Sequence, residues 1–563
     1  MKKLHIITLI LVMILGGLMS GANLTLRAMS VAEAAPKKVK KTATKKKSTS
    51  EPKAESTGGS GEEKAPRAKL DPEEANQLRE AYRLIREKKY EAASQRLYRL
   101  SRNPLLRDYR EELRYKLGLV LMEMGLNQVA AVEFLRVAVK GKSKFLKQSL
   151  EKLSFAADSL NFDVLLNLAI SKITVGDFPA IHKDMLFYRI GEFQLKKKDY
   201  LEAAKNFNRV EPSSRYFYRA KYSQAVALAE DGKAEMSAQS FDEILQNIGS
   251  KEISDPIRVS ALIGKARALY QDKKWDESIN AYREVPRDAN AWHETLFESS
   301  WAMLRGAKFR SALSNFQSLH SPFYENNYLP ESLVLRSIVY LYICKFDELN
   351  KTLGLFENVY GPVRKKILQY LSRRPEPTKI YQDFIAVGDG QGVNQIPLPA
   401  VNKIRKEYDF SQNQSYLANL NGELREYEKL SSTWKNSPLG KYAQKLISLR
   451  IKKTERKLGL IVKRHLFDIK SELRDFFEQV GFLQLEVVNL QKEEVKKELS
   501  KKDEEKALEE LGIATKQVDQ NIDRKFYIQN GFEFWPFQGE YWLDELGNYH
   551  YLGVSSCQKS KNN

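Results

Sequence analysis

The sequence predicts an all-α protein, in which a solenoid of helical hairpins is followed by long helices and a small aromatic-rich C-terminal cap. Three observations predict this fold class. From Asp71 onward, apolar residues recur at helical spacing almost without interruption. The pattern repeats about eight times within residues 71–373, and a heptad pattern then runs through residues 466–490. The 563 residues are 42% apolar and 29% charged, which is typical of a folded domain protein.

The first 35 residues have the layout of a secretory signal peptide. Lys2 and Lys3 precede a mostly apolar run, and residues 32–35 supply the small side chains that signal peptidase needs. The apolar run is close to the shortest length that spans a bilayer, so an uncleaved inner-membrane anchor is the alternative. The sequence therefore predicts export to a bacterial periplasm.

Residues 36–70 predict a disordered, lysine-rich linker. Residues 36–69 hold ten Lys and one Arg against four Glu, so +7 of the net charge of +20 lies in this stretch. Such a segment has too few large apolar side chains to form a core. It acts either as a solubilising spacer or as a contact with an anionic cell wall or membrane surface. The remaining basic charge is spread over helices of mixed sign, so we expect no specific nucleic-acid partner.

A three-residue template recurs within residues 71–373. In its first copy, Ala81 is followed nine residues later by Tyr90 and three residues after that by Ala93. The small residues let two helices of a hairpin approach closely, and the aromatic residue at the turn fills the space between them. The other packing positions are Gly118, Ala130, Gly191, Tyr200, Ala203, Ala266, Trp275, Phe309 and Ala312.

The anchors of these copies lie at positions 90, 127, 162, 200, 234, 275, 309 and 346, which are 34 to 41 residues apart. This pattern resembles the tetratricopeptide repeat (TPR) family, whose period is about 34 residues. The resemblance covers roughly residues 72–360. It implies a superhelix of stacked hairpins with an extended concave face, and a scaffold that grips peptides or helices within complexes.

Two further regions follow the repeats. Residues 374–415 are rich in Pro and Gly and predict a loop or hinge. Residues 416–524 predict long helices with one apolar seam, which is typical of a coiled coil. The seam pairs with a second copy of the chain, with another protein, or with the neighbouring helix around residues 416–451. Its residues are Leu466, Ile469, Leu473, Phe476, Val480, Leu483, Val487 and Leu490.

Residues 525–563 predict either a small cap packed on the long helices or a docking site for a protein partner. Ten aromatic residues lie between positions 526 and 551, and aromatic residues are enriched at interface hot spots. The candidate partner-binding residues are Phe534, Trp535, Phe537, Tyr541 and Trp542. This ending, joined to an exported repeat array, resembles periplasmic TPR proteins of gliding-motility and envelope complexes. That resemblance implies protein partners in the cell envelope.

The sequence offers little for catalysis or metal binding. Its two cysteines exclude a cysteine-based metal cluster, and we expect no cofactor. Cys344 is predicted to be a buried thiol within a repeat helix, and a disulfide with Cys557 in the C-terminal tail is not expected.

Glu298 and Ser299 resemble the Glu-Ser signature of soluble lytic transglycosylases, but the residues that follow do not match that family. The prediction is therefore a non-enzymatic periplasmic scaffold, with a peptidoglycan-binding adaptor as the alternative.

Overall fold

The computed structural model describes residues 71–139, 144–171, 183–248, 256–390, 395–510, 539–549 and 551, with side chains of the last long helix described to residue 492. The predicted signal peptide and lysine-rich linker lie outside these residues. Every regular element in the described ranges is an α-helix or a short 3-10 helix. None of the described helices is both long and apolar enough to cross a membrane.

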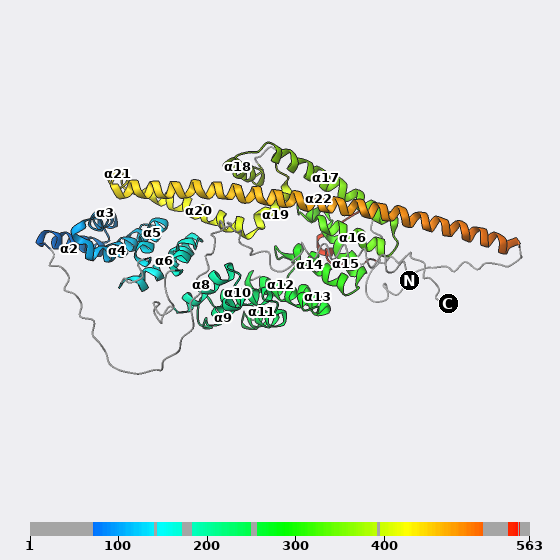
Figure 1. Cartoon of the computed structure of the whole chain (residues 1–563), viewed down its shortest axis with the longest axis horizontal. Coiled ribbons are helices and arrows are strands. Elements are labelled where there is room, and N and C mark those ends of the chain that lie inside the picture. The colour runs from blue at the N-terminus through cyan, green and yellow to red at the C-terminus, as the bar shows by residue number, and fades with distance from the viewer. Residues whose placement is uncertain are drawn as a thin grey trace, which may run out of the picture. The chain divides into compact units, whose positions relative to one another are not determined.

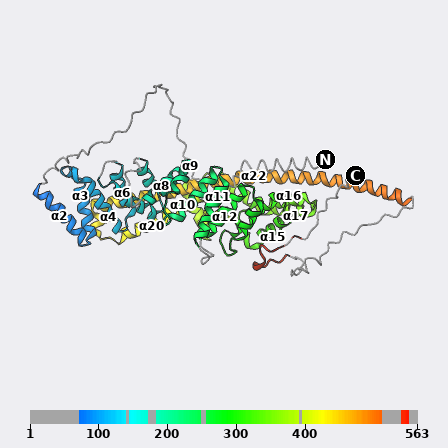
Figure 2. The same cartoon turned by 90° about the horizontal axis from the view of Figure 1, so that it is seen from below.

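The chain forms two compact units (Figures 1 and 2). Among the described residues, unit 1 contains Lys183–Ser411 and those from Glu455 onward, and unit 2 contains residues 71–171 together with Gln412–Thr454. The repeats predicted over residues 71–373 are divided between the two units, and each group of repeats shares its unit with a different part of the later helices.

Sixteen helices within the described ranges pair consecutively as eight hairpins. Those of unit 2 are α2 (Pro72–Arg86) with α3 (Tyr90–Leu100), α4 (Arg110–Glu123) with α5 (Asn127–Ala138), and α6 (Leu146–Leu160) with α7 (Val164–Ile170). Those of unit 1 are α8 (Lys183–Lys196) with α9 (Tyr200–Phe207), α10 (Phe217–Glu230) with α11 (Ala234–Ile248), α12 (Pro256–Gln271) with α13 (Trp275–Arg283), α14 (Trp292–Arg305) with α15 (Phe309–Leu319), and α16 (Pro330–Tyr342) with α17 (Phe346–Ser372).

The predicted anchor positions coincide with the starts of the second helices. Seven of the eight anchors are the first residue of such a helix, and Phe162 lies two residues before α7. In those seven hairpins the residue two positions before the anchor has a positive φ, which turns the chain sharply at the end of the first helix. These turn residues are Lys88, Gly125, Lys198, Gly232, Lys273, Ala307 and Cys344. The all-α hairpin solenoid predicted from the sequence is confirmed.

Glycine and phenylalanine interlock the helices of two hairpins. A Cβ atom on Gly118 would lie 2.6 Å from Phe134 Cε1, and one on Gly191 would lie 2.6 Å from Phe207 Cε1. Glycine is therefore required at these two positions, because a side chain there would overlap the phenylalanine ring. The alanines of the template are fully buried: Ala81, Ala93, Ala130, Ala203, Ala266 and Ala312. The turn aromatics are half-buried: Tyr90, Tyr200, Trp275 and Phe309.

The prediction of a loop over residues 374–415 was wrong. This region contains α18 (Pro377–Gly388), α19 (Leu398–Lys406) and the start of α20 (Tyr408–Lys429). Pro377 and Pro399 occupy the first turns of α18 and α19, where proline favours a helix because no N–H is needed there. Pro377 also lies against the last long helix, since a Cβ atom on Gly459 would overlap the carbonyl oxygen of Pro377.

In unit 2, α20, α21 (Ser432–Asn436) and the start of α22 (Pro438–Glu510) pack on the repeats. Trp434 is fully buried and its indole N–H donates to Ser94 Oγ at 2.9 Å. Glu423 Oε2 accepts the backbone N–H of Gln128 at 2.8 Å, at the N-terminus of α5, where a carboxylate complements the helix dipole. Burial nevertheless raises the pKa of Glu423 to about 8.

In unit 1, the apolar seam of α22 faces the chain itself. Its residues from Leu466 to Val487 are at most 4% exposed, and Leu490 is partly exposed. Phe477 beside the seam makes an edge-on ring contact with Phe356 of α17, with centroids 4.9 Å apart. Figures 1 and 2 both place this part of α22 alongside α16 and α17. Within the described structure, the seam therefore packs intramolecularly, against repeat helices of unit 1.

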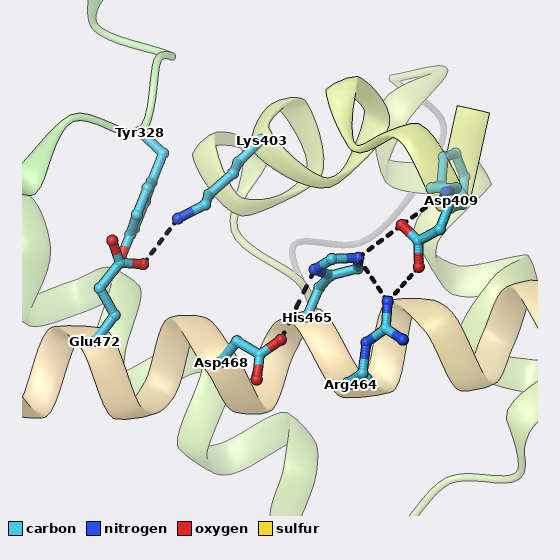
Figure 3. A network of polar contacts seen from close by, with 8 residues as sticks. Tyr328, Lys403, Asp409, Arg464, His465, Asp468 and Glu472 are labelled. Carbon is cyan, nitrogen blue, oxygen red and sulfur yellow. Dashed lines mark hydrogen bonds and ion pairs between the residues drawn. The ribbon is translucent and has the colours of Figure 1, made fainter. Parts of the chain in front are cut away.

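A polar network fixes the position of α22 along unit 1 (Figure 3). Glu472 accepts hydrogen bonds from Lys403 Nζ at 2.7 Å and from the hydroxyl of Tyr328 at 3.3 Å. About two turns earlier in α22, His465 Nε2 lies 3.0 Å from Asp409 Oδ1, and Arg464 pairs with the same carboxylate. Burial alone would raise the pKa of Asp409, but the hydrogen bonds and charges of His465 and Arg464 lower it below its ordinary value.

Glu331 in the first turn of α16 lies beside this network. Its Oε1 atom is buried and has no hydrogen-bond partner among the described residues. Burial raises the pKa of Glu331 to about 7 from an ordinary value of 4.5, Glu472 adds repulsion, and Lys403 opposes the shift. The pKa of Glu331 is higher in the folded chain than in the unfolded chain, so the folded chain binds this proton more tightly. The resulting gain in the free energy of unfolding is complete below about pH 4.5 and is lost as pH rises through about 7.

We predict that Glu331→Gln removes the free-energy cost of ionising the buried Glu331 carboxyl group at alkaline pH. At pH 8 the variant should unfold with a free energy about 1–3 kcal/mol higher than the natural chain, because no buried charge is formed. At pH 4.5 the two proteins should be equal. Chemical denaturation at both pH values measures this, with Glu325→Gln at an exposed position as the control. A variant that is less stable at pH 8 would contradict the account.

Candidate partner-binding surface

The C-terminal strap, defined here as residues 539–549 with Tyr551, lies on the repeats of unit 1. It contains one short 3-10 turn (Leu543–Glu545) and lies against α14, α15 and α16 (Figure 1, red segment). The sequence predicted either a cap on the long helices or a docking site for a protein partner, and the described part of this segment packs on the repeat helices. A repeat surface in this protein therefore already holds a non-helical segment.

Helix α15 binds the backbone of the strap through two serines one turn apart. Ser318 Oγ accepts the N–H of Gly547 at 2.7 Å, and Ser314 Oγ accepts the N–H of Tyr551 at 3.2 Å. Each hydroxyl also donates to a carbonyl oxygen one turn earlier in α15. The helix thus orients both hydroxyls so that their lone pairs face the strap. These contacts recognise main chain and not side-chain identity.

Arg287, in the turn between α13 and α14, supplies the third backbone contact. Its Nη1 donates to the carbonyl oxygen of Asp544 at 3.1 Å, and its Nη2 donates to Asn548 Oδ1 at 2.8 Å. The planar guanidinium therefore contacts the residues at the two ends of one turn of the strap, Asp544 and Asn548.

Leu546 and Gly547 form the apolar anchor of the strap. Leu546 is 1% exposed. Gly547 has φ +82°, and a Cβ atom on it would lie 2.9 Å from the Trp292 ring and 3.6 Å from Leu296 of α14. Glycine is thus required here both for the left-handed backbone and for the close approach.

Tyrosines flank this anchor on both sides. Gln317 Nε2 donates to the hydroxyl of Tyr541 at 3.0 Å, while Arg336 donates to Gln317 Oε1 at 2.8 Å. Tyr551 lies edge-on to Tyr340 of α16, with centroids 6.2 Å apart. Burial raises the pKa of Tyr541 and raises that of Tyr551 to about 12, so both hydroxyls stay protonated at neutral pH.

The strap also presents a solvent-facing apolar pair. Trp542 is 62% exposed and Leu543 is 68% exposed, directly after the docked Tyr541. Of the predicted partner-binding residues, Tyr541 is therefore held on the repeats and Trp542 projects from them. Phe534, Trp535 and Phe537 lie outside the described residues. The docking serines and Arg287 were not predicted, because isolated Ser and Arg residues on a repeat helix carry no distinctive sequence signal.

Cys344 differs from its prediction. It lies in the turn between α16 and α17 with φ +56°, is partly exposed, and is disulfide-bonded. The prediction of a buried thiol within a helix was wrong, because position 344 lies two residues before the anchor at 346. That is the turn position that glycine occupies in two other repeats.

Glu298, the residue considered for catalysis, is engaged in packing between repeats. Its carboxylate accepts two hydrogen bonds from Arg267, at 2.8 and 2.6 Å, and one from the buried hydroxyl of Tyr282 at 2.9 Å. Both carboxylate oxygens of Glu298 are thus engaged by Arg267 and Tyr282, whereas a general acid needs a proton and access to substrate. Among the described residues, no group of His, Cys, Asp and Glu could hold a metal ion.

No protein-family model matches the chain, and no curated protein matches it. Matching solved structures include a tetratricopeptide repeat protein from Parabacteroides merdae, with 13% identity, 43% of this chain and 91% of that chain covered, and a TM-score of 0.26. Another is the Rap protein complexed with competence and sporulation factor, with 13% identity, 69% and 100% coverage, and a TM-score of 0.26.

The structure of Naa15/Naa10 bound to HypK-THB matches with 12% identity, 73% and 63% coverage, and a TM-score of 0.31. These scores are too low to support an argument. The TPR-like fold rests on the eight hairpins, their period and their repeated turn.

We predict that Gly547→Ala releases the strap from α14. The added Cβ meets the Trp292 ring and also needs a strained φ, which together cost about 1–3 kcal/mol. Hydrogen exchange of residues 539–549 should become faster. Gly539→Ala is a matched control, because Gly539 has φ +110° but no atom within 4 Å of the added Cβ. Equal loss of protection in both variants would show that contact with Trp292 does not hold the strap.

Proposed function

We propose that this chain is a non-enzymatic scaffold that binds protein partners through its repeat units and its C-terminal strap. One observation carries the proposal: Ser314, Ser318 and Arg287 hold a segment of consecutive turns largely by its backbone atoms. A surface with this chemistry suits the binding of irregular peptide segments, because main-chain groups are common to all peptides.

The exposed Trp542 and Leu543 are the proposed contact with the partner. Large apolar side chains that remain exposed beside a rigidly held segment are typical of interface anchors. Tyr541 and Leu546 are held on the repeats on either side of Trp542 and Leu543. The backbone of this exposed pair therefore has little conformational freedom left to lose when a partner binds. A partner with an apolar pocket of the size of an indole ring fits this arrangement.

We also propose that the protein acts outside the cytoplasm, in an envelope-associated complex. The signal-peptide layout of residues 1–35 supports export, and the disulfide at Cys344 supports an oxidising compartment. A role in gliding motility is a narrower proposal that rests on the likeness of the C-terminal aromatic segment alone. The absence of catalysis is likewise a proposal, supported by the pairing of Glu298 with Arg267.

Crosslinking in cells followed by affinity purification tests the contact. We predict that the natural chain recovers a defined set of envelope proteins, and that Trp542→Ala with Leu543→Ala reduces that recovery about tenfold or more, as loss of a hot spot does. Leu105→Ala is the matched control, since Leu105 is also highly exposed, at 77%, but lies on unit 2. Undiminished recovery with the double variant would exclude the strap as the contact.

A further inference from the structure

Four arginines lie together in unit 2, on α4, on α5 and just after α3. We call them the arginine cluster, and its members are Arg102, Arg110, Arg114 and Arg136. Among the described residues, Glu133 of α5 is the one carboxylate with an oxygen within 4 Å of any of these guanidinium groups. With Glu133 ionised, four positive charges against one negative charge leave a net charge of +3.

The guanidinium groups of the cluster are close enough to act on one another. Burial lowers the pKa of Arg114, although the charge of Glu133 opposes the shift. The other three members of the cluster lower the pKa of Arg114 further. Like charges held this close repel one another, so an anion that binds among them relieves the repulsion.

Most N–H groups of the cluster are available to a ligand. Arg136 donates to Glu133 and to the hydroxyl of Tyr442, but the other three arginines make no hydrogen bond to any described residue. The Nε atom of Arg110 is buried without a partner there. Each guanidinium has five N–H donors, so the cluster has unused donors beside its unbalanced charge. Arg102 is exposed, which opens the cluster to solvent.

Two tyrosines orient the exposed side of the cluster. The Cζ atom of Arg102 lies 3.5 Å from the ring centre of Tyr98, and that of Arg136 lies 5.7 Å from the ring centre of Tyr442. The two rings pack together, with centroids 6.0 Å apart. A guanidinium that stacks on an aromatic ring keeps its N–H edge for a ligand, so less freedom is lost when an anion binds.

We propose that the arginine cluster of unit 2 is a binding site for a phosphate group. Guanidinium groups bind phosphate oxygens through paired, charge-assisted hydrogen bonds. A phosphate monoester carries nearly two negative charges at neutral pH, so it neutralises more of this cluster than one carboxylate does. The phosphate comes either from a lipid headgroup or from an ion free in solution, since both present the same oxygens. The site shares no residue with the strap and is independent of the proposed function.

Calorimetric titration of the full chain with inorganic phosphate at low ionic strength tests the site. We expect saturable binding that is weaker by about tenfold or more in Arg102→Gln, because a charged donor is lost. Arg99→Gln is the matched control, since Arg99 is also exposed and lies three residues earlier. Equal weakening in both variants, or acetate that binds as tightly as phosphate, would overturn the assignment.

Glu133→Gln should have the opposite effect. It removes the one carboxylate that competes with the ligand for Arg136, so phosphate should bind about threefold tighter or more. Circular dichroism checks that the variant is folded, and Arg102→Gln keeps the site testable if it is not. A folded Glu133→Gln chain that binds phosphate no more tightly than the natural chain would contradict binding at this carboxylate.

Vesicle sedimentation identifies the source of the phosphate. Vesicles of phosphatidylcholine with and without phosphatidic acid are compared, and the lysine-rich linker contributes equally in every variant. Weaker binding of Arg102→Gln than of Arg99→Gln to the phosphatidic acid vesicles supports a lipid headgroup. Equal vesicle binding, together with weakened binding of inorganic phosphate, supports a free phosphate. No difference between the two variants in either measurement would overturn the site.

Discussion

An open stack of helical hairpins leaves apolar surface that the hairpins alone cannot bury, and this protein covers it with its own later helices. In unit 2, α20 contributes Tyr416 and Leu420, which form one apolar cluster with Leu160 at the end of α6. In unit 1, the seam of α22 is buried among the repeat helices. The surface left for a partner depends on these covering helices, because the repeat faces that α20 and α22 occupy are not available to a partner.

Polar contacts define where each covering helix lies. An apolar seam alone tolerates sliding by one heptad, since every turn offers similar side chains. Glu423 on the N-terminus of α5 and Glu472 between Lys403 and Tyr328 each have one position that satisfies them. A displaced helix would leave the buried Glu423 carboxyl group without its backbone donors, at a cost of about 1–3 kcal/mol for an unsatisfied buried group. It would also break the partly exposed Lys403–Glu472 ion pair, which is worth at most about 1 kcal/mol. These polar contacts therefore help to define the register of the covering helices.

The repeats were predictable from sequence because their packing is local. Gly118 with Phe134, and the positive-φ turn before each anchor, lie within one hairpin and recur with one period. The partner of the α22 seam was not predictable, because a heptad pattern has the same form whether it faces a second chain or its own repeats. The proline content of residues 374–415 favours a loop, but proline is also common in the first turn of a helix, which is where Pro377 lies in α18. The strap site was missed because Ser314 and Ser318 act through hydroxyls whose role appears only when a distant segment lies against them.

The later helices thus belong to the fold of the repeats and are not an appended coiled coil. Hydrogen exchange of a chain that ends at residue 373, compared with the full chain, tests this most directly. The account predicts that amides of α3, α5, α16 and α17 lose most of their protection in the shortened chain, because the faces that contact α20–α22 become exposed. Protection equal to that of the full chain would show that the repeats fold without their cover, and would contradict the account.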